Sequence, residues 1–449
     1  MTSTRDPRPA TRAVLVAAIA LAAACARAPV PAATSASETA PSTPRAMNDI
    51  AAEYVRLALA VGVHDADYVD AYYGPAGWKA AADSARLPLA DIAARATALR
   101  AAVAATPTQG LDSLDLLRRT YLDKQLRAML ARIDVVQGRK LAFDDESRAI
   151  YDAVAPTHDE AYFRQLVARL DAALPGTGPV PARYEAWRKQ FVIPRERLDT
   201  VFRAAVAACR ARTAAHVQLP ATESFTIEYV TDKPWSGYNW YKGAYRSVIQ
   251  VNTDLPIFID RALDLACHEG YPGHHVYNAL LERLGRERGW VEFQVYPLFS
   301  PQSLIAEGSA NYGVVMAFPG AERVAFERER LFPLAGLDPA RAAEYYRVQD
   351  LTKALGYAGN EAARGYLDGR MDATRAADWL VRYAINTPAQ AAQRVKFFDA
   401  YRSYVINYNL GEDLVKAYVE RRAGADAAAR WRVFGALLSS PRLPSGLKE

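Results

Sequence analysis

Cysteine is scarce in this sequence, and so are clusters of a single charge. The 449 residues include 3 cysteines and 6 histidines. So few thiols do not make the dense disulfide framework that stabilises small secreted domains. The formal net charge is +5, yet the sequence contains no long run of Lys or Arg. Because a nucleic-acid-binding surface concentrates its basic residues on one face, we expect no nucleic-acid partner.

Long apolar segments are also lacking, and the apolar segment near the N-terminus is short. Arg5, Arg8 and Arg12 precede the apolar residues 13–25, AVLVAAIALAAAC, which are too few to span a bilayer permanently. This order is typical of a signal peptide, so we expect export from the cell. The ending LAAAC resembles a bacterial lipobox, which predicts a signal peptide over residues 1–25 and a lipid on Cys25.

That lipid would be the only membrane attachment, and it would hold the protein in the bacterial cell envelope or periplasm. The alternative is cleavage at the small residues by ordinary signal peptidase, which gives a soluble secreted protein. Residues 26–47 are rich in Ala, Pro, Ser and Thr and predict a disordered tether. Residues 48–449 predict one helical domain, with a small sheet at about 223–253 and a metal-binding core at about 255–318.

Helical periodicity dominates this domain, so we expect a mainly α fold with one small antiparallel sheet beside the site. Apolar residues recur at three-four spacing in EYVRLALAVGV, LADIAARATALRAAVAA and several later segments. The segments SFTIEYVT and YRSVIQVNT predict two strands, with WSGYNWYKG as a turn between them. A helix should follow from TDLP, with Asp254 as its cap and Pro256 in its first turn. Ser300 and Pro301 should begin another.

The histidines gather in ACHEGYPGHHVY, residues 266–277, which holds His268, His274 and His275. The segment looks like the zinc helix H-E-x-x-H, except that Pro272 stands where the second His belongs. In a straight helix His268 and His275 would lie about 10 Å apart along the axis, too far to share one ion. Pro272, with Gly270 and Gly273 beside it, should bend the chain and return His274 or His275 to His268.

A metal in this bend needs further ligands and a base. Glu269 occupies the place of the acid that handles the proton of the attacking water in H-E-x-x-H enzymes. Glu307 lies in the apolar and small-residue segment LIAEGSANYG and is our candidate for the third ligand. We expect one Zn²⁺ per chain. A bridge between Cys209 and Cys267 has no support in the sequence, and we expect Cys267 to be a small buried core residue.

The motifs HEGYPGHHVY and AEGSANYG resemble those of a bacterial family of large, mostly helical proteins of unknown function. Its members carry H-E-x-x-P-G-H-H and a later E-G-x-A-x-Y element, and the family looks like a zincin metallopeptidase of the gluzincin kind. The likeness implies His268 with His274, His275 or both as ligands, Glu307 as the third ligand and Glu269 as the base. Ser309 and Asn311 depart from the bulky residues commoner there, which bears on substrate preference.

A peptidase also needs groups that hold the substrate and the developing oxyanion. Weaker candidates for these roles are Tyr312, Arg402, Tyr404 and Tyr408, with Arg402 as a clamp for a substrate carboxylate. The strand RSVIQVN could pair with an extended peptide. We therefore expect an exported zinc hydrolase of short peptides, of dipeptidase, carboxypeptidase or oligopeptidase type. The alternatives are a metal-binding envelope lipoprotein without turnover and a metal hydrolase of a non-peptide amide or ester.

Overall fold

The computed structural model describes residues 46–233 and 235–448. The predicted signal peptide, its Cys25 and most of the predicted tether therefore lie outside the described residues. Within this range no helix is both long enough and apolar enough to cross a membrane.

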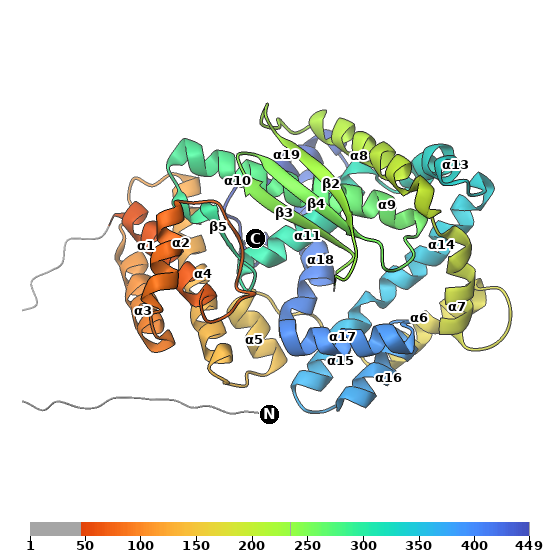
Figure 1. The fold of residues 1–449 in the computed structure, drawn as a ribbon, viewed down its shortest axis with the longest axis horizontal. Helices are drawn as coiled ribbons and strands as arrows, with labels where there is room; N and C mark the ends of the chain where they lie inside the picture. The colour runs from red at the N-terminus through yellow and green to blue at the C-terminus, as the bar shows by residue number, and fades with distance from the viewer. Residues whose placement is uncertain (1–45, 234, 449) are drawn as a thin grey trace, which may run out of the picture. The chain divides into compact units, whose positions relative to one another are not determined.

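Helices form most of the described chain, as the periodicity predicts (Figure 1). Those of the first half are α1 (Met47–Gly62), α2 (Ala76–Ala85), α3 (Leu89–Ala105), α4 (Ser113–Val136), α5 (Phe143–Ile150), α6 (Glu160–Ala173), α7 (Val180–Arg188) and α8 (Leu198–Ala214). Those of the second half are α9 (Ile259–Leu265), α10 (His274–Arg288), α11 (Pro301–Ala317), α12 (Ala321–Phe326), α13 (Phe332–Ala335), α14 (Ala342–Lys353), α15 (Tyr357–Leu367), α16 (Ala373–Tyr383), α17 (Pro388–Tyr401), α18 (Ile406–Ala423) and α19 (Ala427–Leu438).

The small sheet lies where the sequence predicts it, but it has three strands. These are β2 (Ser224–Val230), β4 (Arg246–Asn252) and β3 (Gly237–Gly243), in that order. The segment expected as a turn thus forms β3, because its Tyr and Trp residues suit a half-buried strand. β3 runs antiparallel to β4, whereas β2 runs parallel to it. A second, antiparallel pair joins β1 (Val69–Tyr72) to β5 (Val295–Pro297).

The three-stranded sheet packs on α10 and on the turn that precedes it. Its central strand, β4, contains RSVIQVN and is hydrogen-bonded to a neighbour on each side, so it cannot pair with a peptide. The helix before the turn begins later than expected, with Phe258 rather than Asp254 at its N-cap. Asp254 instead accepts a hydrogen bond from the backbone N–H of Asp232, which ties the ends of β2 and β4 together. Ser300 and Pro301 begin α11 as predicted.

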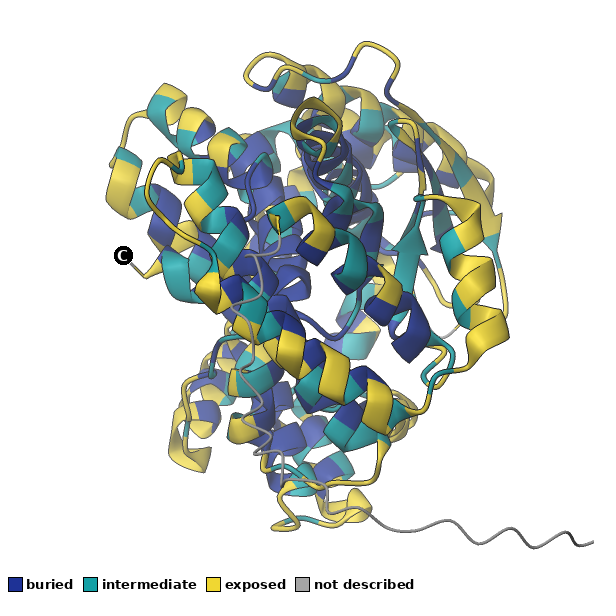
Figure 2. Cartoon of the chain, turned by 90° about the vertical axis from the view of Figure 1, so that its left-hand side faces the viewer, coloured by how far each residue is buried: buried dark blue, intermediate teal, exposed yellow. Residues whose placement is uncertain are grey.

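Helix α11 is almost entirely buried, since nearly all of its residues are apolar or small. Figure 2 shows that buried residues gather in the interior of the described chain and that exposed residues lie on its outer helices and loops. Gly308 lets it meet α18 closely, because a Cβ atom there would lie 2.3 Å from the carbonyl carbon of Gly411. Farther along, a Cβ atom on Gly313 would lie 3.0 Å from Cγ of Pro272, in the bend of the histidine motif. Glycine thus brings α11 against α18 at one level and against the motif at another.

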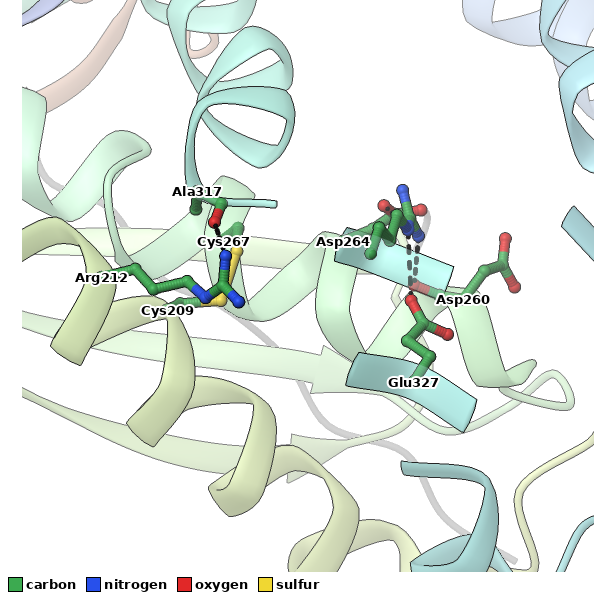
Figure 3. The surroundings of a disulfide bond; sticks show 8 residues. Cys209, Arg212, Asp260, Asp264, Cys267, Ala317 and Glu327 are labelled. Atoms are coloured by element: carbon green, nitrogen blue, oxygen red, sulfur yellow. Dashed lines mark hydrogen bonds and ion pairs between the residues drawn. A yellow bond between two sulfur atoms is a disulfide. The ribbon is translucent and has the colours of Figure 1, made fainter. Parts of the chain in front are cut away.

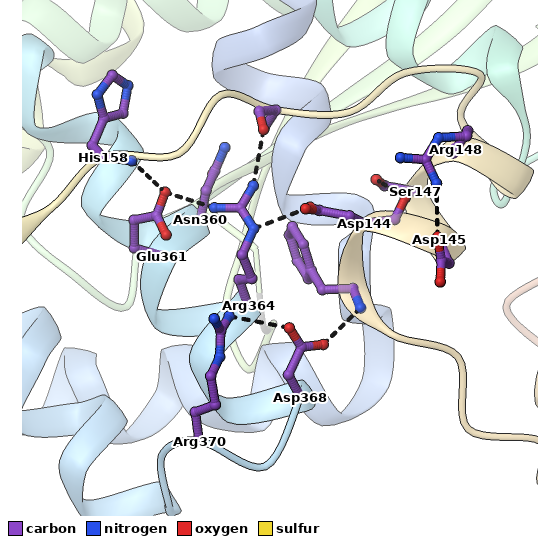
Figure 4. Close-up of polar contacts among 12 residues, drawn as sticks. Asp144, Asp145, Ser147, Arg148, His158, Asn360, Glu361, Arg364, Asp368 and Arg370 are labelled. Atoms are coloured by element: carbon purple, nitrogen blue, oxygen red, sulfur yellow. Dashed lines mark hydrogen bonds and ion pairs between the residues drawn. The ribbon is translucent and has the colours of Figure 1, made fainter.

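Ion pairs and hydrogen bonds join helices that are far apart in the sequence (Figure 4). The guanidinium of Arg364, on α15, donates to Asp144 on α5 at 3.0 Å and to the carbonyl of Ala155 at 2.9 Å. Next to it, Asp368 accepts from the backbone N–H of Phe143 at 2.8 Å. These contacts fix α5 and the segment that follows it against α15.

The contact between α11 and α18 can be tested at Gly308. We expect Gly308→Val to lower the free energy of unfolding by about 1–3 kcal/mol or more, because backbone atoms of Gly411 leave no room for a side chain. Gly77→Ala in α2 is the matched control, since a Cβ atom there meets nothing within 4 Å. Denaturant unfolding measures both. Equal stability of the Gly308 variant and the wild type would contradict the packing described.

Candidate metal centre

The histidine motif folds back on itself after one turn of π-helix. Residues Ala266–Gly270 form the π-helix, and α10 begins at His274. The turn is closed by a hydrogen bond of 2.9 Å from the N–H of Gly273 to the carbonyl of Cys267. A Cβ atom on Gly273 would lie 1.8 Å from the carbonyl oxygen of His268, so only glycine fits there. The bend predicted from Pro272 and its glycines is therefore present.

The bend brings His268 and His274 together with Glu307 of α11. The Nε2 atoms of the two histidines lie 3.1 Å apart. Oε2 of Glu307 lies 3.4 Å from Nε2 of His268 and 3.8 Å from Nε2 of His274. One ligand atom from each residue falls within 4.8 Å of the other two. Two imidazoles and a carboxylate at this spacing fit a zinc ion with ligand distances of about 2.0–2.2 Å and one open position.

Glu307 has a buried oxygen that the described residues leave unsatisfied. Its Oε1 accepts a hydrogen bond of 2.8 Å from the hydroxyl of Tyr404. Its Oε2, which faces the two histidines, has no hydrogen-bond partner in residues 46–233 or 235–448. A buried carboxylate oxygen without a partner is costly. A cation shared with the imidazoles would satisfy it, so the residues fit the metal that the motif implies.

The electrostatics of Glu307 and His274 favour the forms that bind metal, whereas the carboxylates of Glu307 and Glu269 outweigh burial and raise the pKa of His268. Burial raises the pKa of Glu307, but the two imidazoles beside it outweigh this and hold the pKa below the ordinary value. Burial and the charge of His268 lower the pKa of His274 to about 4. Near neutral pH, Glu307 is therefore ionised and His274 keeps a free lone pair, as metal ligands must.

A second residue of α11, Asn311, orients His268. Its side-chain Nδ2 donates to the carbonyl of Tyr408 at 2.8 Å, which leaves Oδ1 as the acceptor for Nδ1–H of His268 at 2.9 Å. The proton therefore lies on Nδ1, and the lone pair of Nε2 faces Glu307 and His274. Metal-binding histidines are commonly fixed by such an outer hydrogen bond. The sequence marks Asn311 only as a departure from the resembling family, so this role was not predicted.

Glu269 lies beside the three ligands without joining them. Only 5% of the residue is exposed, and no described hydrogen bond uses its carboxylate. Burial, and then the charge of Glu307, raise its pKa to about 7. Its backbone carbonyl accepts from Nδ2 of Asn239 at 2.7 Å, which attaches the π-helix to β3. The arrangement leaves the carboxylate available for proton transfer near neutral pH.

The structure places His275 outside the cluster. Its Nδ1 lies 2.8 Å from the hydroxyl of Ser247, and its Nε2 lies 3.0 Å from Glu223. Glu223 also binds Tyr271 and Arg210. Both ring nitrogens of His275 are thus engaged, and this imidazole anchors the start of α10 to the sheet. Of the two histidines considered as the second ligand, His274 is the one that faces His268.

The weaker candidates for holding the substrate or the oxyanion also differ in what they contact. Arg402 pairs with Glu146 and lies away from the cluster, so the structure does not support it as a carboxylate clamp. Tyr312 is buried against Phe434. Tyr404 binds Glu307, and the ring of Tyr408 lies 5.7 Å from that of Tyr404. The charge of Glu307 raises the pKa of Tyr408 in addition to the effect of its burial, so the hydroxyl of Tyr408 keeps its proton.

A disulfide holds the π-helix to α8 (Figure 3). It joins Cys209 to Cys267, the residue directly before His268. Cys267 is fully buried as predicted, but the expectation of an unpaired core cysteine is wrong. The pairing depends on how α8 packs on the motif, which the spacing of the two cysteines does not indicate.

A carboxylate from the N-terminal region also reaches the site. Asp70 lies on β1 and accepts a hydrogen bond from the hydroxyl of Tyr238 on β3. Burial raises the pKa of Asp70 to about 7, with smaller contributions from the charges of Glu307 and Glu269. No motif surrounds Asp70 in the sequence, so sequence reasoning missed it.

No family model matches the sequence, and no curated protein sequence matches it either. The structure is similar to a candidate lipoprotein from Colwellia psychrerythraea, with 17% identity, a TM-score of 0.49, and coverage of 89% of this chain and 74% of that one. It is similar to a candidate lipoprotein of unknown function from Shewanella oneidensis, with 11% identity, a TM-score of 0.41, and coverage of 80% and 75%.

A third similar structure is an M32 carboxypeptidase from Deinococcus radiodurans R1, with 15% identity, a TM-score of 0.39, and coverage of 89% of this chain and 93% of that one. These likenesses are too remote to assign an activity. The family suggested by the two motifs therefore remains a prediction.

The ligand set predicts a graded loss of metal. We expect His274→Ala and Glu307→Gln to lose zinc at stoichiometric concentration, whereas Asn311→Leu should weaken zinc binding by about 10- to 100-fold by releasing the His268 ring. His216→Ala, which removes an exposed histidine, is the control. Elemental analysis and a chelator competition measure all four. Full zinc content in His274→Ala and Glu307→Gln would rule out this centre.

Proposed function

We propose that this protein is a zinc-dependent peptidase that acts on short peptides outside the cytoplasm. The observation that supports this most is the position of Glu269, a buried carboxylate directly beside a His-His-Glu cluster but free of it. A storage site has no use for an acid that does not bind the metal. A hydrolase needs one, because water must lose a proton as it attacks a carbonyl.

Zinc bound by His268, His274 and Glu307 would polarise a substrate carbonyl and lower the pKa of water. Glu269 takes the proton of the attacking water and delivers it to the leaving amine. Because its pKa lies at about 7 in the protein alone, it can accept and return a proton near neutral pH. Tyr404 and Asn311 hold Glu307 and His268 in place during these steps.

Tyr408 is the best-placed donor for the oxyanion that forms on the substrate. The hydroxyl of Tyr404 is already used by Glu307, whereas no described residue accepts a hydrogen bond from the hydroxyl of Tyr408. Its raised pKa keeps it protonated, so it can donate. A donor aimed at a developing negative charge contributes strongly to such reactions.

The free edge of β3 supports a peptide as the substrate. β3 is an outer strand, and its far side has no backbone partner among the described residues. It passes close to the base, since a Cβ atom on Gly237 would lie 3.3 Å from Oε1 of Glu269. An extended peptide can add to such an edge through its main chain. β3 therefore takes the place of β4, the strand that contains RSVIQVN, as the proposed peptide-binding strand, because β4 has no free edge.

Export is supported by two independent features. The N-terminal residues carry the charge and apolar pattern of a lipoprotein signal, and the Cys209–Cys267 disulfide suits an oxidising compartment. Both the signal pattern and the disulfide are consistent with the envelope or periplasm of a bacterium. A metal hydrolase of a non-peptide amide or ester uses the same residues, and it is distinguished by the substrate alone.

Glu269 gives the decisive variant. We expect Glu269→Gln to retain zinc and stability but to lose about 10²- to 10⁴-fold in peptide hydrolysis, because the amide keeps the shape and lacks the basicity. Glu287→Gln, at an exposed position on α10, is the matched control. Turnover of short peptides with free termini, measured beside zinc content, tests this. Equal hydrolysis by Glu269→Gln and wild type would refute the mechanism, and a zinc-loaded wild type that cleaves no peptide would refute the peptidase.

A further inference from the structure

Arg394, on α17, is a partly buried cation without an anionic partner. No hydrogen bond or ion pair joins it to any residue in 46–233 or 235–448. Its guanidinium lies instead among aromatic rings, 4.5 Å from the centre of Phe397, 5.9 Å from Phe398 and 6.0 Å from Tyr408. Burial lowers its pKa, which shows that the surroundings penalise its charge. A carboxylate ligand would compensate that charge with two parallel hydrogen bonds.

Aromatic contacts connect Arg394 to the metal centre. Along α17 and into α18, the ring of Phe397 lies 4.8 Å from Tyr401, Tyr401 lies 6.2 Å from Tyr404, and Tyr404 lies 5.7 Å from Tyr408. Tyr404 holds Glu307. Tyr408, whose ring centre lies 6.0 Å from the guanidinium of Arg394, also accepts at its carbonyl from Asn311, the residue that orients His268. Two sets of side-chain contacts therefore connect Arg394 to the metal ligands.

The charged groups near the base include the carboxylates of Asp70 and Glu307 and the guanidinium of Arg261. Asp70, Glu269 and Glu307 act on one another through their charges. They repel an anionic end of a substrate, so such an end needs a cation of its own. Arg402 is bound to Glu146, and Arg261 lies 3.7 Å from Asp264. Arg394 has no such partner among the described residues, and its exposure is intermediate.

We propose that Arg394 binds the C-terminal carboxylate of the peptide and so directs the enzyme to substrates with a free C-terminus. The inference rests on the proposed peptidase activity and adds the substrate class. The alternative for Arg394 is a purely structural stack on Phe397 and Phe398. The two roles differ in what they discriminate: a structural stack affects every peptide alike, whereas a carboxylate clamp affects only peptides that carry the charge.

The test uses zinc-loaded protein and pairs of short peptides that differ only in a free or an amidated C-terminus. We expect the wild type to prefer the free form by about 10- to 100-fold in kcat/KM, as befits a charge-assisted contact. Arg394→Met should lose that preference because its kcat/KM falls only for peptides with a free C-terminus. Arg394→Lys should keep part of the preference. Arg382→Met, which removes an exposed arginine 5.7 Å from the ring of Tyr383 on α16, is the control.

Each other outcome overturns the inference in a recognisable way. Equal cleavage of both forms by the wild type would leave the peptidase standing and remove the clamp. A preference that survives in Arg394→Met would place the clamp elsewhere, and an equal loss on both forms would assign Arg394 a structural role. Failure of the wild type to cleave either form of any peptide would overturn the proposed function together with the inference.

Discussion

One buried oxygen sets the conditions for the rest of the site. Oε2 of Glu307 lies in an almost entirely buried helix, faces two imidazoles, and has no hydrogen-bond partner in the described chain. Such an atom destabilises the fold unless a cation shares it. The surrounding contacts keep it in this position: Tyr404 occupies the other oxygen, and Asn311 turns the lone pair of His268 toward it.

The backbone makes this possible at two glycines. Gly273 allows the chain to fold back against the carbonyl of His268, and Gly308 allows α11 to touch α18. The first brings His274 to His268, and the second brings Tyr404 and Tyr408 to Glu307. The disulfide at Cys267 attaches the same π-helix to α8. The ligands are thus held by backbone and side-chain packing, which favours a site with defined geometry over an adaptable one.

The sequence predicts the parts of the site that depend on local chemistry. A proline and two glycines between histidines indicate a bend, and an acidic residue in an apolar helix indicates a buried role, so His268, Glu269 and Glu307 can be selected. The choice between His274 and His275 cannot be made this way, because Ser247 and Glu223 decide it from other elements. The same holds for Asp70, for the pairing of Cys209, and for the ion pair that Arg402 makes with Glu146. β3 was missed because Gly237, Asn239 and Gly243 are residue types that favour a turn.

We propose that two imidazoles and one carboxylate bind a single zinc ion, with no sulfur ligand. X-ray absorption spectroscopy of the zinc-loaded protein tests this most directly, since it reports the kind and distance of the ligand atoms. We expect ligand atoms of nitrogen and oxygen only, at about 2.0–2.2 Å, with the outer-ring scattering of two imidazoles. A sulfur shell at about 2.3 Å, or a spectrum without imidazole scattering, would contradict it.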